Sequence, residues 1–148
     1  MTPPPQTRRT AGDCGFALHD LPADPASASD IRRRLTHWLT ENPLTSSEQR
    51  SGDIVLAVYE AVANAAEHAY RAAPRDSPAQ STIAVDTRYR ERTRTLQIAV
   101  TDHGQWKPAV PTRIRGRGLI LIRALADHAD VDTGPTGTTV TMHWRLFS

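Results

Sequence analysis

The sequence predicts an α+β fold: a two-layer α/β sandwich whose mostly antiparallel, mixed sheet carries its helices on one face. Apolar residues recur at helical spacing over 27–41, 47–71 and 119–128, and they alternate with polar residues in the stretches between and around them. The expected order of elements is βααββαββ. Strands that alternate, rather than being apolar throughout, indicate a sheet with one side toward solvent.

The first half of the chain is expected to hold an edge strand and two helices. Weak alternation over 16–21 predicts the strand. Ser27 or Ser29 can cap the first helix, which Asn42-Pro43 ends, because the residue before a proline disfavours helix. Ser47 can cap a second, longer helix that ends near residue 71.

In the second half the apolar period changes to two. Alternation at 83–85 and 96–100 predicts a β-hairpin, with 88–94 as its charged tip. A third helix is expected at 119–128, and a closing strand at 138–147 completes the sheet after a turn at Gly134-Pro135.

Length and composition indicate one domain. The chain has 148 residues, 39% hydrophobic and 23% charged, which suits a globular core. Residues 1–13, rich in proline and lacking the apolar stretch of a signal peptide, are expected to be a disordered tail, and 14–148 to form the domain. Cys14 is the one cysteine, so we expect a reducing, cytoplasmic location.

Charge and hydropathy exclude two classes of partner. The formal net charge is only +2 despite a pI near 9.1, and the one tight basic run, Arg32–Arg34, lies on an expected helix where a solvated or partner-facing surface is the better interpretation. We therefore expect no direct nucleic-acid binding. No apolar run reaches the roughly 18 residues that a membrane span needs, so no membrane partner is expected.

A polar stripe crosses the long helix. Glu60, Asn64 and His68 are spaced i, i+4, i+8 and share one face, bordered mainly by alanine and valine. An amide oxygen can ligate Mg²⁺ while a carboxylate one turn away acts as a base. An ordinary solvated helix face is an equally good interpretation of this stripe alone.

A carboxylate ends an inward face of the hairpin. Asp102 continues the alternation of 96–100 and therefore points where the apolar residues point. A buried carboxylate needs a donor, which an adenine amino group could supply; a strand-end turn is the alternative. Thr138, after Gly137, begins the inward face of the last strand, so the two side chains could meet around one ligand.

A glycine-rich segment leads into the third helix. Arg115-Gly116-Arg117-Gly118 precedes Leu119. Glycines allow close approach of the backbone, and a helix N-terminus offers unpaired N–H groups with partial positive charge, as phosphate sites do. A single GxG motif has low specificity. It supports a phosphate site here because the polar stripe on the long helix and the inward-facing Asp102 and Thr138 occur in the same chain.

Together these segments resemble the GHKL ATPase domain of gyrase, a heat-shock chaperone family, histidine kinases and MutL repair proteins. Within it they are most similar to the anti-sigma-factor serine/threonine kinases of bacterial partner switching. Glu60–Tyr70 matches the N box, Asp102-His103-Gly104 the first glycine box, Arg115–Leu119 the second and Gly137–Val140 the last. The resemblance extends from about residue 14 to the end.

The resemblance implies a role for each matched residue. Glu60 would be the catalytic base and Asn64 the ligand of Mg²⁺, while His68 would act only indirectly. Asp102 would accept from the adenine amino group of ATP with Thr138 supporting it. Gly104 would let the base lie close, and the second glycine box would surround the phosphates with Arg115, Gly116, Arg117, Gly118 and Leu119.

One position departs from the family pattern. The first glycine box usually has a second glycine where this chain has Trp106. The bulky side chain would either stiffen the loop over the nucleotide or lie against the ligand.

The leading hypothesis is an ATP-dependent protein serine/threonine kinase that sequesters a sigma factor and phosphorylates an anti-sigma-factor antagonist; it leaves a homodimer possible. The alternative is a non-catalytic module in which nucleotide gates a protein-binding surface that regulates a sigma factor. Retention of Glu60 favours the kinase. A histidine-kinase fragment would need an upstream helix pair, and a gyrase-like or MutL-like ATPase would need further domains.

Overall fold

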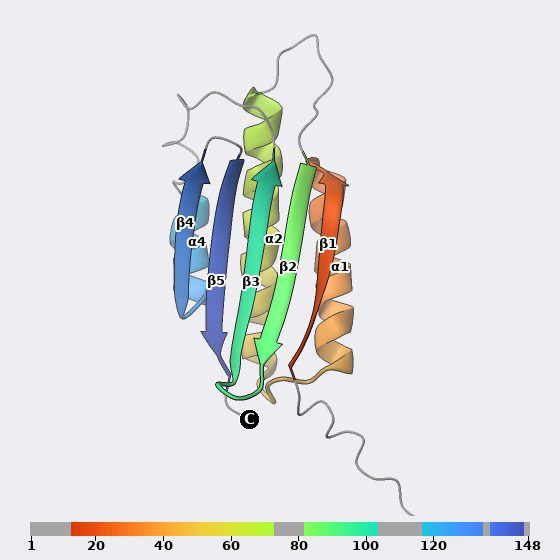
Figure 1. The fold of residues 1–148 in the computed structure, drawn as a ribbon, viewed down its shortest axis with the longest axis vertical. Coiled ribbons are helices and arrows are strands. Elements are labelled where there is room, and N and C mark those ends of the chain that lie inside the picture. The colour runs from red at the N-terminus through yellow and green to blue at the C-terminus, as the bar shows by residue number, and fades with distance from the viewer. Residues whose placement is uncertain (1–12, 73–81, 104–116, 135–136, 147–148) are drawn as a thin grey trace, which may run out of the picture.

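The computed structural model describes residues 13–72, 82–103, 117–134 and 137–146. They form a two-layer α/β sandwich in the expected order of elements, with helices on one face of a five-stranded sheet, as Figure 1 shows. Residues 1–12 of the tail expected at 1–13, and Pro135 of the expected turn, lie outside the described residues. The fold class predicted from the two periodicities is confirmed.

The elements are two helices after an edge strand, a hairpin, a short helix and a second hairpin. Their bounds are β1 Cys14–Pro22, α1 Pro25–Glu41, α2 Glu48–Ala72, β2 Thr82–Arg90, β3 Thr95–His103, α4 Arg117–Leu125, β4 His128–Gly134 and β5 Gly137–Arg145. The sheet order is β1-β2-β3-β5-β4. Each neighbouring pair among these strands is antiparallel. The sheet was expected to be mixed, but the described strands contain no parallel pair.

Helix caps and ends differ in part from expectation. The cap of α1 is Asp24, whose Oδ1 accepts from the Ser27 N–H at 3.1 Å, with Pro25 following; the prediction of Ser27 or Ser29 was wrong. The Ser27 hydroxyl instead donates to Pro22 O, at 2.6 Å. Ser47 does cap α2, since its Oγ accepts from the Arg50 N–H at 3.0 Å.

The second-half boundaries also shift by a few residues. Strand β2 continues to Arg90, so the hairpin turn is 91–94 rather than 88–94. Helix α4 ends at Leu125 rather than 128, because His128 already pairs with His143 across β4 and β5. Pairing between strands therefore includes residues at the end of β2 and the start of β4 that the sequence periodicity had assigned to a turn and a helix.

The core lies between the sheet and the helices. The inward residues of β3 (Leu96, Ile98 and Val100) are buried and alternate with half-buried ones, as the period of two predicted. Opposite them, the central helix α2 presents Ile54, Val58 and a series of alanines. Figure 1 shows α2 behind the middle of the sheet, and its Ala57 and Ala61 are almost fully buried.

A polar cluster fixes the ends of three elements to one another. Nη2 of Arg50, near the start of α2, lies 2.8 Å from Asp127 Oδ2 and 3.0 Å from Arg145 O. The backbone N–H of Arg145 donates to the same carboxylate at 2.7 Å. Nearby, Trp144 is fully buried and its Nε1 donates to Leu125 O at 3.0 Å, which ties the end of α4 to β5. These contacts hold α4 in place over the sheet.

Candidate functional site

A small cavity opens between α2, α4 and the strands β3, β5 and β4. Its walls come from five elements that are far apart in sequence, and its volume is about 60 Å³. It is lined by Ala61, Asn64, Ala65, Val100, Asp102, Leu119, Ile122, Val131, Thr138 and Val140. The structure therefore brings together four residues predicted from sequence, one from each of the polar stripe, the strand end, the glycine-rich segment and the last strand.

The two strand-end side chains meet at the sheet. Asp102 of β3 and Thr138 of β5 are direct partners in the antiparallel register. Asp102 is only 3% exposed, although it stands at the end of its strand. The expectation that its carboxylate points inward with the apolar residues of β3 is confirmed by this burial.

A glycine makes the close approach at this point possible. Gly137, just before Thr138, has a φ of +152°, and a Cβ there would lie 1.8 Å from the carbonyl oxygen of Asp102. No other residue type can take this position without moving one strand. Gly137 thus sets the spacing that presents Thr138 and Asp102 to the same cavity.

Burial sets the charge state of Asp102. Loss of hydration raises the pKa of its carboxyl from 3.8 to about 6, and the neighbouring His103 lowers it by a smaller amount. At neutral pH the group is thus mainly a carboxylate, surrounded largely by apolar residues. Such a group gains much from a ligand N–H, since hydrogen bonds to buried charges are strong.

The polar stripe on α2 divides at the cavity. Asn64 lines it together with Ala61 and Ala65, while Glu60, one turn earlier and half-buried, is not among the lining residues. The two side chains share one helix face, so Glu60 precedes Asn64 along the side of α2 that borders the cavity. The side chain of His68 lies outside the described part of the chain.

The helix α4 brings its first turns to the same place. Leu119 and Ile122 form an apolar wall, so the N-terminus of α4, which carries partial positive charge, lies close to the cavity. Arg117 and Gly118 belong to that first turn, but their side chains are not described. The expected site residues Gly104, Arg115 and Gly116, and with them Trp106, lie outside the described residues.

Sequence reasoning missed several apolar wall residues. Val131 of β4 and Ile122 of α4 line the cavity together with Asn64 and Asp102 but carry no chemical motif. Two signals could have found them. Ile122 follows Leu119 at helical spacing, and Val131 is the inward neighbour of Ala129 in a strand whose other residues are polar.

The size of the cavity limits what it can hold. Ligand pockets usually enclose about 300–1,000 Å³, whereas the walls described here enclose about 60 Å³. The cavity enclosed by the described walls therefore accommodates only part of a ligand of that size.

The fold and this cavity define a class: an α+β domain with a cavity between one face of an antiparallel sheet and two helices. The model of the family described as the histidine kinase-like ATPase domain matches residues 21–144. The chain belongs to this family of ATP-binding domains, and the GHKL resemblance is confirmed.

A solved structure is also similar. It is the crystal structure of the RsbU and RsbW domains of Rv1364c from Mycobacterium tuberculosis, with 30% sequence identity and a TM-score of 0.66. The match covers 88% of this chain and 32% of that one, so this chain spans about a third of its length.

Among the described residues, none of the helices is both long and apolar enough to cross a membrane.

Proposed function

We propose that this chain is an ATP-dependent protein serine/threonine kinase that also binds a sigma factor, with an anti-sigma-factor antagonist as its phosphate acceptor. One observation carries the proposal: Asn64, Asp102, Leu119 and Thr138, from four separate segments, line a single cavity. Similarity to an RsbW domain supports the regulatory setting.

The residues present fit a nucleotide and its metal ion. A buried carboxylate that is mostly ionised at neutral pH suits the adenine amino group, and the close approach at Gly137 leaves Thr138 beside it. Asn64 would hold Mg²⁺ through its amide oxygen, an appropriate ligand for a hard cation. When bound, Mg²⁺ supplies charge neutralisation on the phosphates.

Glu60 is proposed as the base. The acceptor hydroxyl oxygen of the antagonist forms a bond to the γ-phosphorus of ATP, and the bond from that phosphorus to the β–γ bridging oxygen breaks, so that ADP leaves. The hydroxyl proton passes to the Glu60 carboxylate. Glu60 lies one turn before Asn64 and is not among the residues that line the cavity. This place suits contact with a partner's hydroxyl better than contact with the adenine ring of ATP.

Two substitutions on one helix test the assignment. Glu60→Ala should reduce transfer of radiolabelled phosphate to a purified candidate antagonist by about 10²–10⁴-fold while leaving ATP affinity largely intact. Asn64→Ala should lose Mg²⁺-dependent ATP binding and transfer together. Glu60→Gln, which keeps the shape of the side chain and removes its basicity, is the matched control.

The competing function is a nucleotide-gated binding module without catalysis. It predicts ATP binding by the wild type with no phosphorylation of any candidate antagonist, whereas both functions predict that Glu60→Ala leaves sigma-factor binding largely intact. Undiminished transfer by the Glu60→Ala variant would remove the base assignment. Pull-downs performed with ATP and with ADP would identify the partners to use in both assays.

A further inference from the structure

The row of residues that contains Glu60 and Asn64 continues toward the start of α2. Leu56 precedes Glu60 by four residues, and Gly52 precedes Leu56 by another four. Each step of four residues advances one turn and rotates by about 40° around the axis. The α2 row, Gly52, Leu56, Glu60 and Asn64, therefore begins on the solvent side of the helix and ends in the cavity wall at Asn64.

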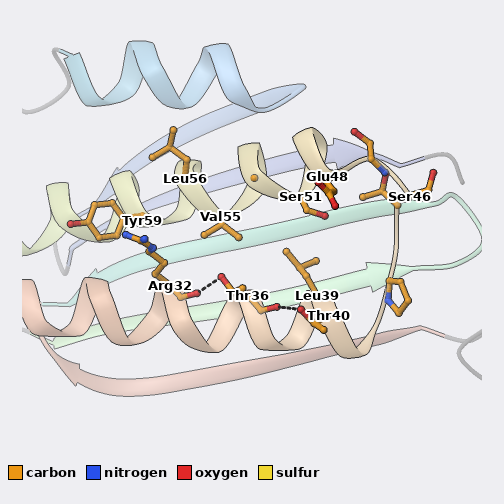
Figure 2. A pocket seen from close by; sticks show the side chains of 14 residues that line it. Arg32, Thr36, Leu39, Thr40, Ser46, Glu48, Ser51, Val55, Leu56 and Tyr59 are labelled. Carbon is orange, nitrogen blue, oxygen red and sulfur yellow. Dashed lines mark hydrogen bonds between the residues drawn. The ribbon is translucent and has the colours of Figure 1, made fainter.

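Leu56 is an exposed apolar side chain in this row. It is 42% exposed, and Figure 2 shows it pointing away from α1, toward the side of α2 on which α4 lies. The nearby Tyr59 differs, because the Arg32 guanidinium lies over its ring, 5.7 Å from the centroid. An exposed leucine alone is ordinary. This one lies a single helical turn from the proposed base.

Gly52 is a glycine that the fold of the chain does not require. A Cβ at this position would meet no atom of the described residues within 4 Å, apart from its own stretch of helix. Glycine destabilises the interior of a helix relative to alanine, so its presence in α2 has a cost. No packing among the described residues offsets this cost. The missing side chain leaves the backbone of α2 open to another molecule.

The proposed reaction brings another chain to this surface. The acceptor hydroxyl must come within about 3 Å of the Glu60 carboxylate, and the residues that flank it follow at about 3.8 Å per Cα. Four residues of α2 rise by about 6 Å, and two residues of an extended segment span about 6.6 Å. Side chains two residues apart in such a segment point to the same face, so the steps of the two chains match.

We propose that Leu56 and Gly52 determine which acceptor segment the kinase phosphorylates. An extended segment of the protein substrate lies along the α2 row with its serine or threonine at Glu60. An apolar side chain two residues from the acceptor contacts Leu56, and the backbone four residues from the acceptor lies against Gly52. This inference rests on the proposed function and specifies its substrate class. Both residues bind the substrate, and neither takes part in the transfer.

Substitution of Leu56 tests the apolar contact. The substrate is the antagonist recovered by pull-down, with its acceptor residue located by mass spectrometry. Leu56→Asp should raise KM for this antagonist by about tenfold or more, with kcat and the KM for ATP unchanged. Leu56→Met, which conserves volume, should retain the wild-type KM. Ser29→Asp makes the same change of charge at an exposed position of α1 and is the matched control.

Substitution of Gly52 separates substrate binding from folding. Gly52→Ala should raise the midpoint of urea denaturation, because the added methyl group meets open space and restricts the unfolded chain. The same variant should raise KM for the antagonist by about threefold or more, and Gly52→Gln should raise it further. A glycine with a purely structural role would lose stability instead. Ser29→Gln is the control for the larger side chain.

An exchange of side chains tests the pairing directly. An antagonist variant with aspartate two residues from the acceptor should be a poor substrate for the wild type. Leu56→Lys should reverse the preference, with a higher kcat/KM for the aspartate variant than for the unaltered antagonist. A general loss of activity in Leu56→Lys would lower both values and would leave the preference as in the wild type.

Several results would overturn the inference. They are an unchanged antagonist KM in Leu56→Asp or in Gly52→Gln, a lower urea midpoint for Gly52→Ala, and an acceptor with no apolar residue two positions away. A raised KM for ATP in Leu56→Asp would place that residue in the nucleotide site instead. A wild type that phosphorylates no candidate antagonist would end the proposed function and this inference together. Normal transfer by the wild type with unaltered KM in the variants would end this inference alone.

Discussion

Replacing Asp102 by asparagine is expected to make the nucleotide-free protein more stable at neutral and alkaline pH, although it removes a proposed ligand contact. The carboxyl is 3% exposed, and burial raises its pKa from 3.8 to about 6. The folded protein therefore binds a proton more tightly than the unfolded chain does. The stability that comes from this proton is complete below pH about 4 and is lost as the pH rises through about 6.

The magnitude follows from that difference. At about 1.4 kcal/mol per pH unit, the interval from 3.8 to about 6 corresponds to about 3 kcal/mol. Solvent near the strand end screens part of it, so about 1–3 kcal/mol of added stability above pH 7 is expected for Asp102→Asn. Urea denaturation of both proteins at pH 5, 6, 7 and 8, roughly spanning the titration, measures it.

The same variant should bind ATP more weakly. An asparagine can turn its NH₂ group toward the adenine amino group, and loss of a hydrogen bond to a charged acceptor costs about 1.5–3 kcal/mol, or about tenfold or more in affinity. An Asp102→Asn protein that is less stable than wild type at pH 8, or that binds ATP equally well in calorimetry, would refute this account of the buried carboxylate.

Three further substitutions test the packing around the site. Gly137→Ala should cost about 2–4 kcal/mol in chemical denaturation and should impair ATP binding, because its Cβ would lie 1.8 Å from Asp102 O; normal stability would contradict the close approach. Thr87→Val should stabilise by about 1 kcal/mol, since the Thr87 hydroxyl is buried and has no hydrogen-bond partner among the described residues; a lower thermal midpoint would contradict this. Arg50→Ala should cost about 0.5–1 kcal/mol at pH 7. Burial raises the pKa of Asp127, but the hydrogen bonds and charges of Arg50 and of Arg145 outweigh this effect and lower the pKa. The free-energy cost of Arg50→Ala should therefore vanish as the pH falls through that lowered pKa. An unchanged cost at low pH would contradict the pairing of Arg50 with Asp127.

The periodicities were sufficient to predict the order of elements because each helix and strand buries one face. In β3 the alternation from Leu96 to Asp102 predicted both the sheet face and the burial of the carboxylate, and both are observed. Local chemistry was a weaker guide. Asp24, Ser27 and Ser29 are all good capping residues, and the choice of Asp24 depends on Pro25, whose fixed φ suits the first helical position.

The candidate site was predictable where a polar residue interrupts an apolar pattern. Asp102 and Thr138 stood out for that reason, and the antiparallel register of β3 and β5 places them opposite each other. Val131 is apolar on an apolar face, so its place at the cavity depends on which strands become neighbours. The hollow of about 700 Å³ between α1 and α2 was not predicted at all, because it arises from the separation of two helices and no short motif encodes it.

Trp106 should report nucleotide binding through its fluorescence. It follows Asp102 by four residues in the sequence, within the segment that resembles the first glycine box. The other tryptophans are placed in packing: Trp144 is fully buried with its Nε1 bonded to Leu125 O, and the Trp38 ring lies against Phe16 with centroids 5.3 Å apart.

Addition of saturating Mg-ATP should therefore change the emission of the wild type, and Trp106→Phe should remove most of that change. Trp38→Phe is the matched control and should retain it, because that ring packs between α1 and β1 rather than near the cavity. The titration midpoint should agree with the calorimetric affinity for ATP. A full response that survives Trp106→Phe and disappears in Trp38→Phe would place the nucleotide-sensitive surface at the helices, and the assignment of the cavity at Asp102 would then be wrong.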